Sequence, residues 1–248
     1  MFKAFGPQGW WPVTPPGGAA PVYASGRYTL PDERGAFEIC VGAILTQNTS
    51  WTNVEKALAE LRRADLLSPD KIARCPLPRL ERAVRSSGYF RQKAQRVKEF
   101  CGRFLKDHPE GLARWFSSSG TPELRAELLS YKGVGPETAD CIVLYAAGKP
   151  SFVIDAYTRR IGKRLGFARE LSYDGWKALF ESALPPDVKV YNEYHALLVK
   201  LGKDFCRKAK PLCAACPLGR LCAKRIYEPG KNRRPAGRRR IREGAGRH

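Results

Sequence analysis

Four cysteines near the end of the 248-residue chain have the type and spacing of metal ligands. They follow the pattern C-x6-C-x2-C-x5-C and are Cys206, Cys213, Cys216 and Cys222. Disulfide pairing is disfavoured in a reducing compartment, so thiolate ligation of a metal is the better interpretation. Zinc usually takes two separated C-x-x-C pairs, which this single compact segment lacks. The cysteines therefore predict a metal centre and fit zinc less well.

Asp155 is the carboxylate whose position best suits it to act on a substrate. It follows a short apolar run at residues 151–154 and precedes a helix predicted over residues 156–165. A carboxylate at this place can be the N-cap of that helix and nothing more. It can equally be a charged group that faces a reaction centre, and the local pattern leaves both interpretations open.

A glycine turn lies about 20 residues before this aspartate and separates two predicted helices. The first helix covers residues 123–130, and the second begins at Pro136 and stops before Pro150. The turn itself consists of Gly133, Val134 and Gly135. Backbone N–H groups in such a helix-hairpin-helix can bind one phosphate of a nucleic acid, although a lone turn of this kind is also common between ordinary helices.

Two further segments carry aromatic or amide side chains outside predicted helices. Trp10 and Trp11 lie in a Gly- and Pro-rich segment, residues 1–31, where they either cover a hydrophobic surface or stack on a base. Gln47 and Asn48 separate an amphipathic helix that starts near Gly35 from a second one at about residues 52–63. These amides can be simple helix caps.

The charge of the chain indicates a polyanionic partner. Forty-four Lys and Arg against 24 Asp and Glu give a net charge of +20, which favours nucleic acid over an anionic membrane. The helix after Tyr89 carries Arg91, Lys93, Arg96 and Lys98, a pattern typical of a solvated basic face. Because there is no apolar run of 18 residues and no signal-peptide pattern, we expect a soluble, cytoplasmic protein.

The segments KGVGPETAD and VIDAYTRRIGKRLG resemble the helix-hairpin-helix and Gly/Pro-Asp signature of the endonuclease III superfamily of DNA glycosylases. The resemblance extends from about Phe37 to Cys222. It implies that Asp155 is the catalytic carboxylate and that the four cysteines bind a [4Fe–4S] cluster. It also implies that Gln47 or Asn48 fills the gap left by an extruded nucleotide and that Tyr89 intercalates. Basic Arg207 and Lys208 in the cysteine loop are placed to meet a phosphate.

The resemblance also bears on the reaction type. Members of the family with lyase activity carry a nucleophilic lysine two residues after the second hairpin glycine, and here that position is Glu137. Without an amine there, no Schiff base can form, so the resemblance implies a monofunctional, hydrolytic glycosylase without AP-lyase activity.

The tract FEICVGAILTQNTSWTNVEKAL looks most like the 3-methyladenine DNA glycosylase branch of that superfamily. In that branch two aromatic walls form the base pocket, which implies Trp51 on one side and Trp10, or Trp11, on the other. Electron-rich indoles would favour a cationic alkylated base by stacking and cation–π attraction, worth about 1–2 kcal/mol.

We therefore expect an all-α fold of two helical domains with the helix-hairpin-helix at their junction. Residues 37–148 would form a six-helix barrel-like domain, residues 1–36 and 149–224 a domain with the cluster loop, and residues 225–248 a basic tail. The expected partner is double-stranded DNA with a damaged base, bound by a monomer. The alternatives are a glycosylase for uracil, mismatched or oxidised bases, and a non-catalytic DNA-binding protein.

Overall fold

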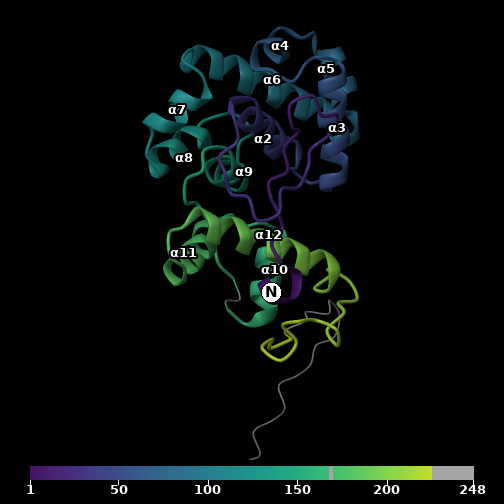
Figure 1. Cartoon of the computed structure of the whole chain (residues 1–248), viewed down its shortest axis with the longest axis vertical. Coiled ribbons are helices and arrows are strands. Elements are labelled where there is room, and N and C mark those ends of the chain that lie inside the picture. Colours follow the sequence, from purple (N-terminus) through teal and green to yellow (C-terminus); the bar gives the residue numbers. More distant parts are fainter. Residues whose placement is uncertain (168–169, 225–248) are drawn as a thin grey trace, which may run out of the picture.

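The computed structural model describes residues 1–167 and 170–224, and in this part of the chain the fold is all-α (Figure 1). The first seven helical elements are α1 (Phe2–Phe5), α2 (Glu33–Leu45), α3 (Trp51–Arg63), α4 (Pro69–Arg74), α5 (Leu77–Ala83), η1 (Arg85–Ser87) and α6 (Phe90–Asp107). The others are α7 (Leu112–Ser118), α8 (Thr121–Leu129), α9 (Pro136–Cys141), η2 (Ile142–Ala146), α10 (Ala156–Leu165), α11 (Tyr173–Ala183) and α12 (Val188–Asp204). Among the described residues, Val13 and Val22 form an isolated β-bridge and no strand is present.

The helices form two lobes (Figure 1). One contains α2 to α9 and has α2 at its centre, buried from Gly35 to Leu45. The side chain of Asp32 caps α2 by accepting from the Gly35 N–H, which fixes where this central helix begins. The other lobe contains α10, α11, α12 and the cysteine loop, and α10 packs against α12.

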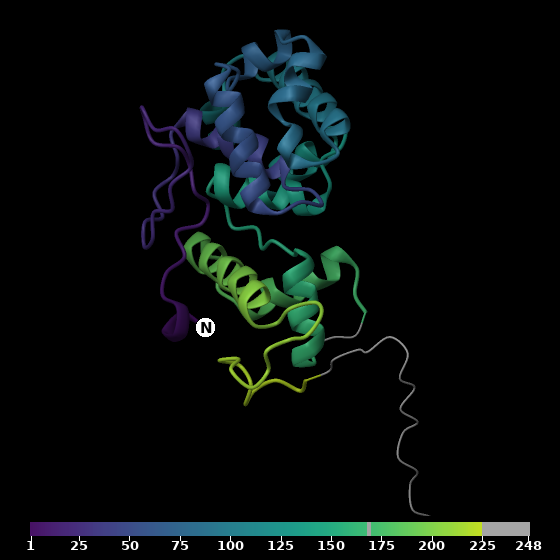
Figure 2. The ribbon, with the colours of Figure 1, turned by 90° about the vertical axis from the view of Figure 1, so that its right-hand side faces the viewer.

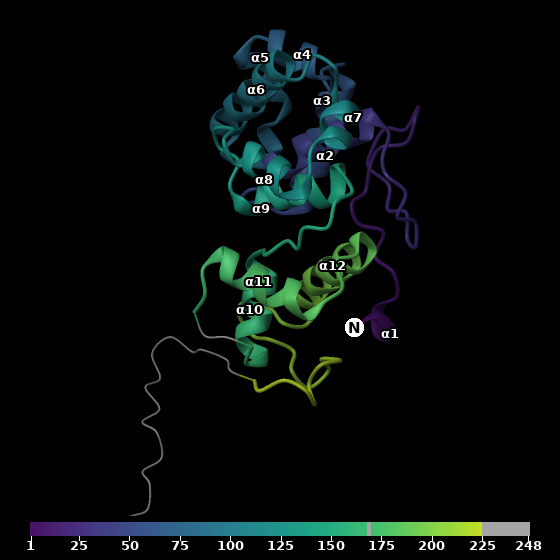
Figure 3. The same cartoon turned by 90° about the vertical axis from the view of Figure 1, so that its left-hand side faces the viewer.

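The N-terminal segment runs along both lobes at one side of the molecule (Figures 2 and 3). A carboxylate from each lobe holds it: Glu193 of α12 accepts from the Gln8 N–H, and Glu38 of α2 accepts from the Thr14 N–H and hydroxyl. Both acids are buried, and these hydrogen bonds offset part of the cost of burying them. Trp10 and Trp11 lie between the two attachment points.

The hairpin forms between α8 and α9, as the glycine pattern predicts. Gly133 takes a positive φ of 83°, a conformation that suits glycine, whereas Gly135 has a φ of −92° and serves as the N-cap of α9. Only one of the two glycines therefore uses its backbone freedom. The second helix does not stay α-helical to its end, since it continues from Ile142 to Ala146 as a π-helical segment, η2.

We propose the domain division expected from the sequence, 37–148 against 1–36 with 149–224, because the chain passes between the lobes near these bounds (Figures 1 and 3). The predicted basic tail, residues 225–248, lies outside the described residues. None of the helices in the described part of the chain has the length and hydropathy needed to cross a membrane.

Candidate active site

Asp155 is both a helix cap and a buried carboxylate. Its Oδ1 accepts from the Thr158 N–H at 2.6 Å, and the residue is 9% exposed. Burial alone would raise the pKa of this carboxyl, but His195 and the Thr158 N–H lower the pKa below its ordinary value overall. Asp155 is therefore held as an anion at the start of α10, where the helix dipole also favours negative charge.

A histidine and a tyrosine from two other elements lie beside this carboxylate. His195 Nε2 of α12 is 3.7 Å from Asp155 Oδ2, and its Nδ1 is 2.6 Å from the hydroxyl of Tyr145 in η2. Both side chains are nearly buried. Neither residue was predicted from the sequence.

Glu137 lies in the first turn of α9, and the charge of Asp155 affects its pKa. Desolvation first, and then the negative charge of Asp155, raise the pKa of Glu137 to about 7. His195 and Arg159 oppose this shift. Glu137 is exposed as a residue, so solvent weakens the repulsion relative to a fully buried pair.

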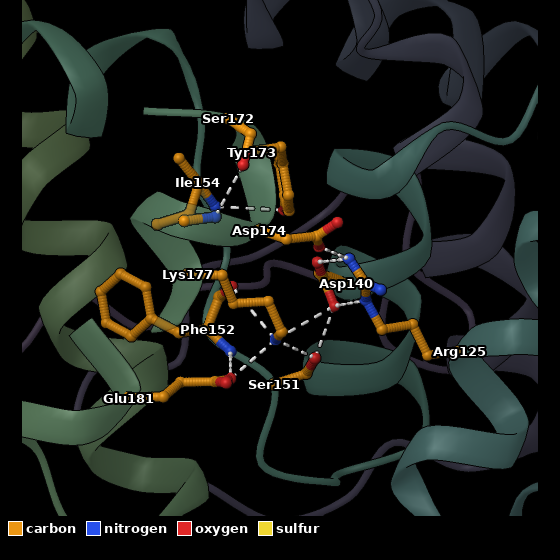
Figure 4. Close-up of polar contacts among 11 residues, drawn as sticks. Arg125, Asp140, Ser151, Phe152, Ile154, Ser172, Tyr173, Asp174, Lys177 and Glu181 are labelled. Carbon is orange, nitrogen blue, oxygen red and sulfur yellow. Dashed lines mark hydrogen bonds and ion pairs between the residues drawn. The ribbon is translucent and has the colours of Figure 1, made fainter. Parts of the chain in front are cut away.

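A buried ionic network anchors the segment that leads to Asp155 (Figure 4). Asp140 of α9 is fully buried and contacts Arg125 at 2.9 Å, the Ser151 hydroxyl at 2.5 Å and Lys177 at 3.2 Å. A buried carboxylate with three such partners has its desolvation largely compensated.

The same network reaches the backbone of the apolar run. Lys177 of α11 also binds Glu181 at 2.6 Å, and Glu181 accepts from the Phe152 N–H at 2.8 Å. One residue before Asp155, the Ile154 N–H donates to the Tyr173 hydroxyl at 3.2 Å. The run from Ser151 to Ile154 is thereby fixed to α9 and α11, and Asp155 is fixed with it.

The three tryptophans singled out in the sequence come together in one cluster. The ring centroid of Trp51 is 5.0 Å from those of both Trp10 and Trp11, with interplanar angles of 64° and 84°. Trp11 is also 5.3 Å from Tyr145, so the cluster adjoins the Asp155 site. A base stacked between two rings needs near-parallel planes about 7 Å apart, twice a good carbon contact distance. The indoles instead contact one another edge to face, and no such slot is open.

The two amides after α2 have different surroundings. Gln47 donates to the Gly133 carbonyl and the Thr138 hydroxyl, and accepts from Arg96 at 2.6 Å. Asn48 is exposed, with a positive φ of 54°. Gln47 therefore ties this loop to the hairpin, and Asn48 is the amide that extends from it.

The expected solvated basic face of α6 is only partly present. Lys93 is 2% exposed and donates to the carbonyls of Leu45 at 2.8 Å and Ser87 at 2.6 Å. Desolvation, and then Arg96, lower the pKa of Lys93 to about 8. Lys93 thus joins the end of α2 to the turn that presents Tyr89, which is 69% exposed in a left-handed conformation.

The hairpin turn offers fewer free N–H groups than its sequence suggests. The Val134 N–H donates to the Tyr131 carbonyl at 3.0 Å. Within the part of the chain that the structure describes, the N–H groups of Gly133 and Gly135 have no such partner. A phosphate at this turn would therefore meet the glycine N–H groups and the start of α9.

Comparison with known proteins identifies the family. Residues 41–186 match the family described as HhH-GPD superfamily base excision DNA repair protein. The chain belongs to this superfamily. A protein of Methanocaldococcus jannaschii that is named as a DNA repair glycosylase is 42% identical over 90% of this chain and 92% of its own. The HhH-GPD chain is accordingly a DNA glycosylase of base excision repair, with DNA as its partner.

Two solved structures similar to this HhH-GPD protein differ in their ligands. An endonuclease III trapped in a covalent intermediate with DNA has a TM-score of 0.66 and 27% identity, covering 76% of this chain and 84% of that one. The 3-methyladenine DNA glycosylase of H. pylori, bound to 1,N6-ethenoadenine, has a TM-score of 0.61 and 29% identity, covering 71% and 90%.

The cysteine loop of the HhH-GPD protein follows α12. Its four predicted ligands line one pocket: Cys206, Cys213, Cys216 and Cys222. Within residues 1–167 and 170–224, no three His, Cys, Asp or Glu side chains are grouped as a site for a single metal ion. Arg164 of α10 donates to Cys206 Sγ at 3.3 Å and to the carbonyls of Arg207 and Lys208, whose side chains are exposed.

Proposed function

We propose that the chain is a monofunctional DNA glycosylase in which Asp155 is the catalytic carboxylate. Breaking an N-glycosidic bond places positive charge on the sugar, and a nearby carboxylate stabilises that charge and helps a water molecule attack. The observation that carries this proposal is the buried Asp155 at the N-terminus of α10, where His195 and the Thr158 N–H lower the pKa of its carboxyl. To reach it, a nucleotide must leave the DNA stack, which costs a few kcal/mol.

The residue at the lysine position supports hydrolysis without strand cleavage. Glu137 has no amine, so it cannot form an imine with the sugar. Its first-turn position in α9 and its response to the charge of Asp155 support its placement at the same site. We propose that this protein releases DNA in which the abasic site is not cleaved.

We propose an alkylated purine, such as 3-methyladenine, as the base. Three clustered indoles, one of which contacts Tyr145 of the Asp155 site, support an aromatic pocket, and the similarity to the H. pylori enzyme supports the same branch. Because the indoles contact one another, Trp10 or Trp11 has to move from Trp51 before a base can stack. Uracil, mismatched and oxidised bases are the alternatives that the test below separates.

The proposal extends to the groups around the site that would hold damaged duplex DNA. We propose that the glycine N–H groups of the hairpin bind a phosphate and that Asn48 fills the gap left by the flipped nucleotide. Gln47 then acts by fixing the Asn48 loop to the hairpin. Exposed Tyr89 would intercalate, and Arg207 and Lys208 would meet phosphates.

We propose that the four cysteines bind a [4Fe–4S] cluster. The four cysteines line one pocket, and thiolates are the usual ligands of iron–sulfur clusters. The Arg164 donor at Cys206 Sγ and the Lys224 N–H at Cys222 Sγ suit thiolate ligands. When bound, the cluster would cross-link the loop.

The test measures bases released from alkylated, deaminated and oxidised duplex DNA by mass spectrometry, with wild type and Asp155→Asn. Wild type should release an alkylated purine and leave intact abasic sites. Asp155→Asn keeps the cap oxygen but loses the charge, so it should abolish release while binding damaged duplex about as well.

Borohydride trapping provides the second arm. Little covalent complex should form, because no lysine occupies the Glu137 position. Efficient trapping would overturn the monofunctional assignment, and release by Asp155→Asn would overturn the role of the carboxylate. Release of uracil alone would show that the substrate is uracil and that the assignment of an alkylated purine is wrong.

A further inference from the structure

One ring nitrogen of a buried histidine faces the proposed catalytic carboxylate. His195 is 4% exposed, and among the described residues its Nε2 has no hydrogen-bond partner. That nitrogen is 3.7 Å from Asp155 Oδ2, while Nδ1 is 2.6 Å from the Tyr145 hydroxyl. The imidazole therefore bridges η2 and the start of α10. A buried, unpaired polar atom is unfavourable unless it has a partner in another state of the protein.

The neighbours of the imidazole determine which nitrogen carries a proton. Desolvation first, and then the charges of Cys141, Asp155 and Glu193, raise the pKa of Tyr145 well above its ordinary value, so its hydroxyl stays protonated. If that hydroxyl donates to Nδ1, the neutral imidazole carries its proton on Nε2. If the imidazole is doubly protonated, Nε2 is again an N–H. The remaining tautomer would direct a lone pair of Nε2 at an anionic carboxylate.

We propose that His195 is a positioning residue: its Nε2–H orients the Asp155 carboxylate, and Tyr145 fixes the imidazole that presents this donor. The inference rests on the proposed catalytic role of Asp155. The present 3.7 Å separation is longer than a hydrogen bond. Hydrogen bonds at catalytic groups are often long in the free enzyme and shorten when substrate is bound.

The two oxygens of Asp155 would then have separate donors. Oδ1 accepts from the Thr158 N–H within α10, and Oδ2 would accept from His195 of α12. Two donors from two elements fix the plane of the carboxylate, whereas the cap alone leaves one oxygen free to turn away from the sugar. His195 also keeps the carboxylate ionised, since it lowers the pKa of Asp155 against the effect of burial.

Other charged or titratable groups face this site and define the background for a pH measurement. They come from α9, η2, α10 and α12 and are Glu137, Cys141, Tyr145, Arg159 and Glu193. A variant that changes only His195 retains all five of these groups. A shift in the acid limb of the rate profile then reports the loss of the imidazole donor.

Two amide substitutions of His195 distinguish the roles of its two ring nitrogens. His195→Gln places an N–H near the Nε2 position, within reach of Asp155, and His195→Asn places one only near Nδ1, toward Tyr145. Single-turnover release is measured against pH on a duplex carrying the base that wild type releases. In parallel, affinity is measured for duplexes with a neutral tetrahydrofuran or a cationic pyrrolidine in place of the nucleotide, because the pyrrolidine mimics the charged sugar.

We expect His195→Asn to release base at least tenfold more slowly and to lose activity at higher pH on the acid side. Its preference for pyrrolidine over tetrahydrofuran should fall at least tenfold, with tetrahydrofuran affinity within twofold of wild type. His195→Gln should retain the rate within about threefold, and Tyr145→Phe should shift the acid limb in the same direction as His195→Asn, by less.

Wild-type rates and pyrrolidine preference in His195→Asn would overturn the inference. It would also fail if both amide variants lost tetrahydrofuran affinity and thermal stability together, since His195 would then be only a packing residue. In either case an inactive Asp155→Asn leaves the proposed function standing. Base release by Asp155→Asn would instead overturn the proposed function itself.

Discussion

The two sides of the proposed site are held in different ways. On the carboxylate side, Asp155 ends a segment whose neighbours are fixed by buried ion pairs and backbone hydrogen bonds to α9 and α11. On the indole side, Trp10 and Trp11 belong to the non-helical stretch between α1 and α2, which is attached through Glu38 and Glu193. The indole N–H groups of both tryptophans are buried without a hydrogen-bond partner in the described part of the chain.

This difference suits the two sides to different tasks in the proposed reaction. A carboxylate that stabilises developing charge is most effective when its position is fixed before the reaction. For the indoles to form the proposed base pocket they have to separate first, and parting an aromatic pair costs about 0.5–1.5 kcal/mol. The proposed site thus combines a charged side that is fixed by its neighbours with an apolar side that has to rearrange.

The largest effect is expected from the anchor of the rigid side. Asp140→Asn removes the charge between Arg125 and Lys177, and unbalancing a buried ionic group should lower the free energy of unfolding by about 3 kcal/mol. Urea unfolding followed by circular dichroism measures it.

Asp174→Asn is the matched control for this variant. Asp174 binds the same Arg125 at 2.7 Å, but its side chain is 70% exposed. Its loss should cost less than about 1 kcal/mol. Equal effects of the two variants would show that the buried network does not anchor the segment before Asp155.

On the indole side the quantity compared is activity, measured where circular dichroism shows each variant to be folded, because Trp51 is buried and its truncation also leaves a cavity. Trp51→Ala should slow base release at least tenfold, since losing a stacking face costs about 1–3 kcal/mol. Trp10→Ala and Trp11→Ala are measured in the same assay. The one that lowers the rate by a similar factor identifies the second aromatic wall of the proposed base pocket. Full activity in Trp51→Ala would remove the main support for an aromatic pocket.

Much of the framework could be predicted from sequence because its signals are local. The helix-hairpin-helix follows from its glycines and Pro136, and Asp155 was predicted to precede a helix that indeed begins at Ala156. The resemblance placed Trp10, Trp11 and Trp51 in one pocket, and they do lie together, although edge to face. Their roles in DNA repair stay predictions.

The supporting residues could not be predicted because their partners are distant in sequence. Asp140 and Lys177 are 37 positions apart, and Tyr145 and His195 are 50 apart. A signal existed for two of them: Asp140 lies among the apolar residues of the hairpin helix, and His195 among those of α12. Such residues need buried partners. A single sequence can indicate that a polar residue needs a buried partner, but it does not identify that partner. The burial of Lys93 has no such signal in the sequence.

The smallest effect is expected at Glu137, which is influenced by the charge of Asp155. Its ordinary pKa of 4.5 is raised to about 7 in the folded protein. Between these values the folded chain keeps a proton that the unfolded chain releases, so the free energy of unfolding should fall as pH rises through this window. Because Glu137 is exposed as a residue, we expect less than about 1 kcal/mol.

Glu137→Gln should flatten this dependence between pH 4.5 and 7, because the glutamine cannot lose a proton. Thermal unfolding across that range measures it, with Glu123→Gln, an exposed glutamate in the first turn of α8, as the matched control. The double variant with Asp155→Asn gives the decisive comparison. If the field of Asp155 contributes to the shift, Asp155→Asn should reduce the slope while Glu137 is present and change it little once Glu137 is glutamine. Equal changes in both backgrounds would mean that the two carboxyl groups titrate independently and that Glu137 does not share the site of Asp155.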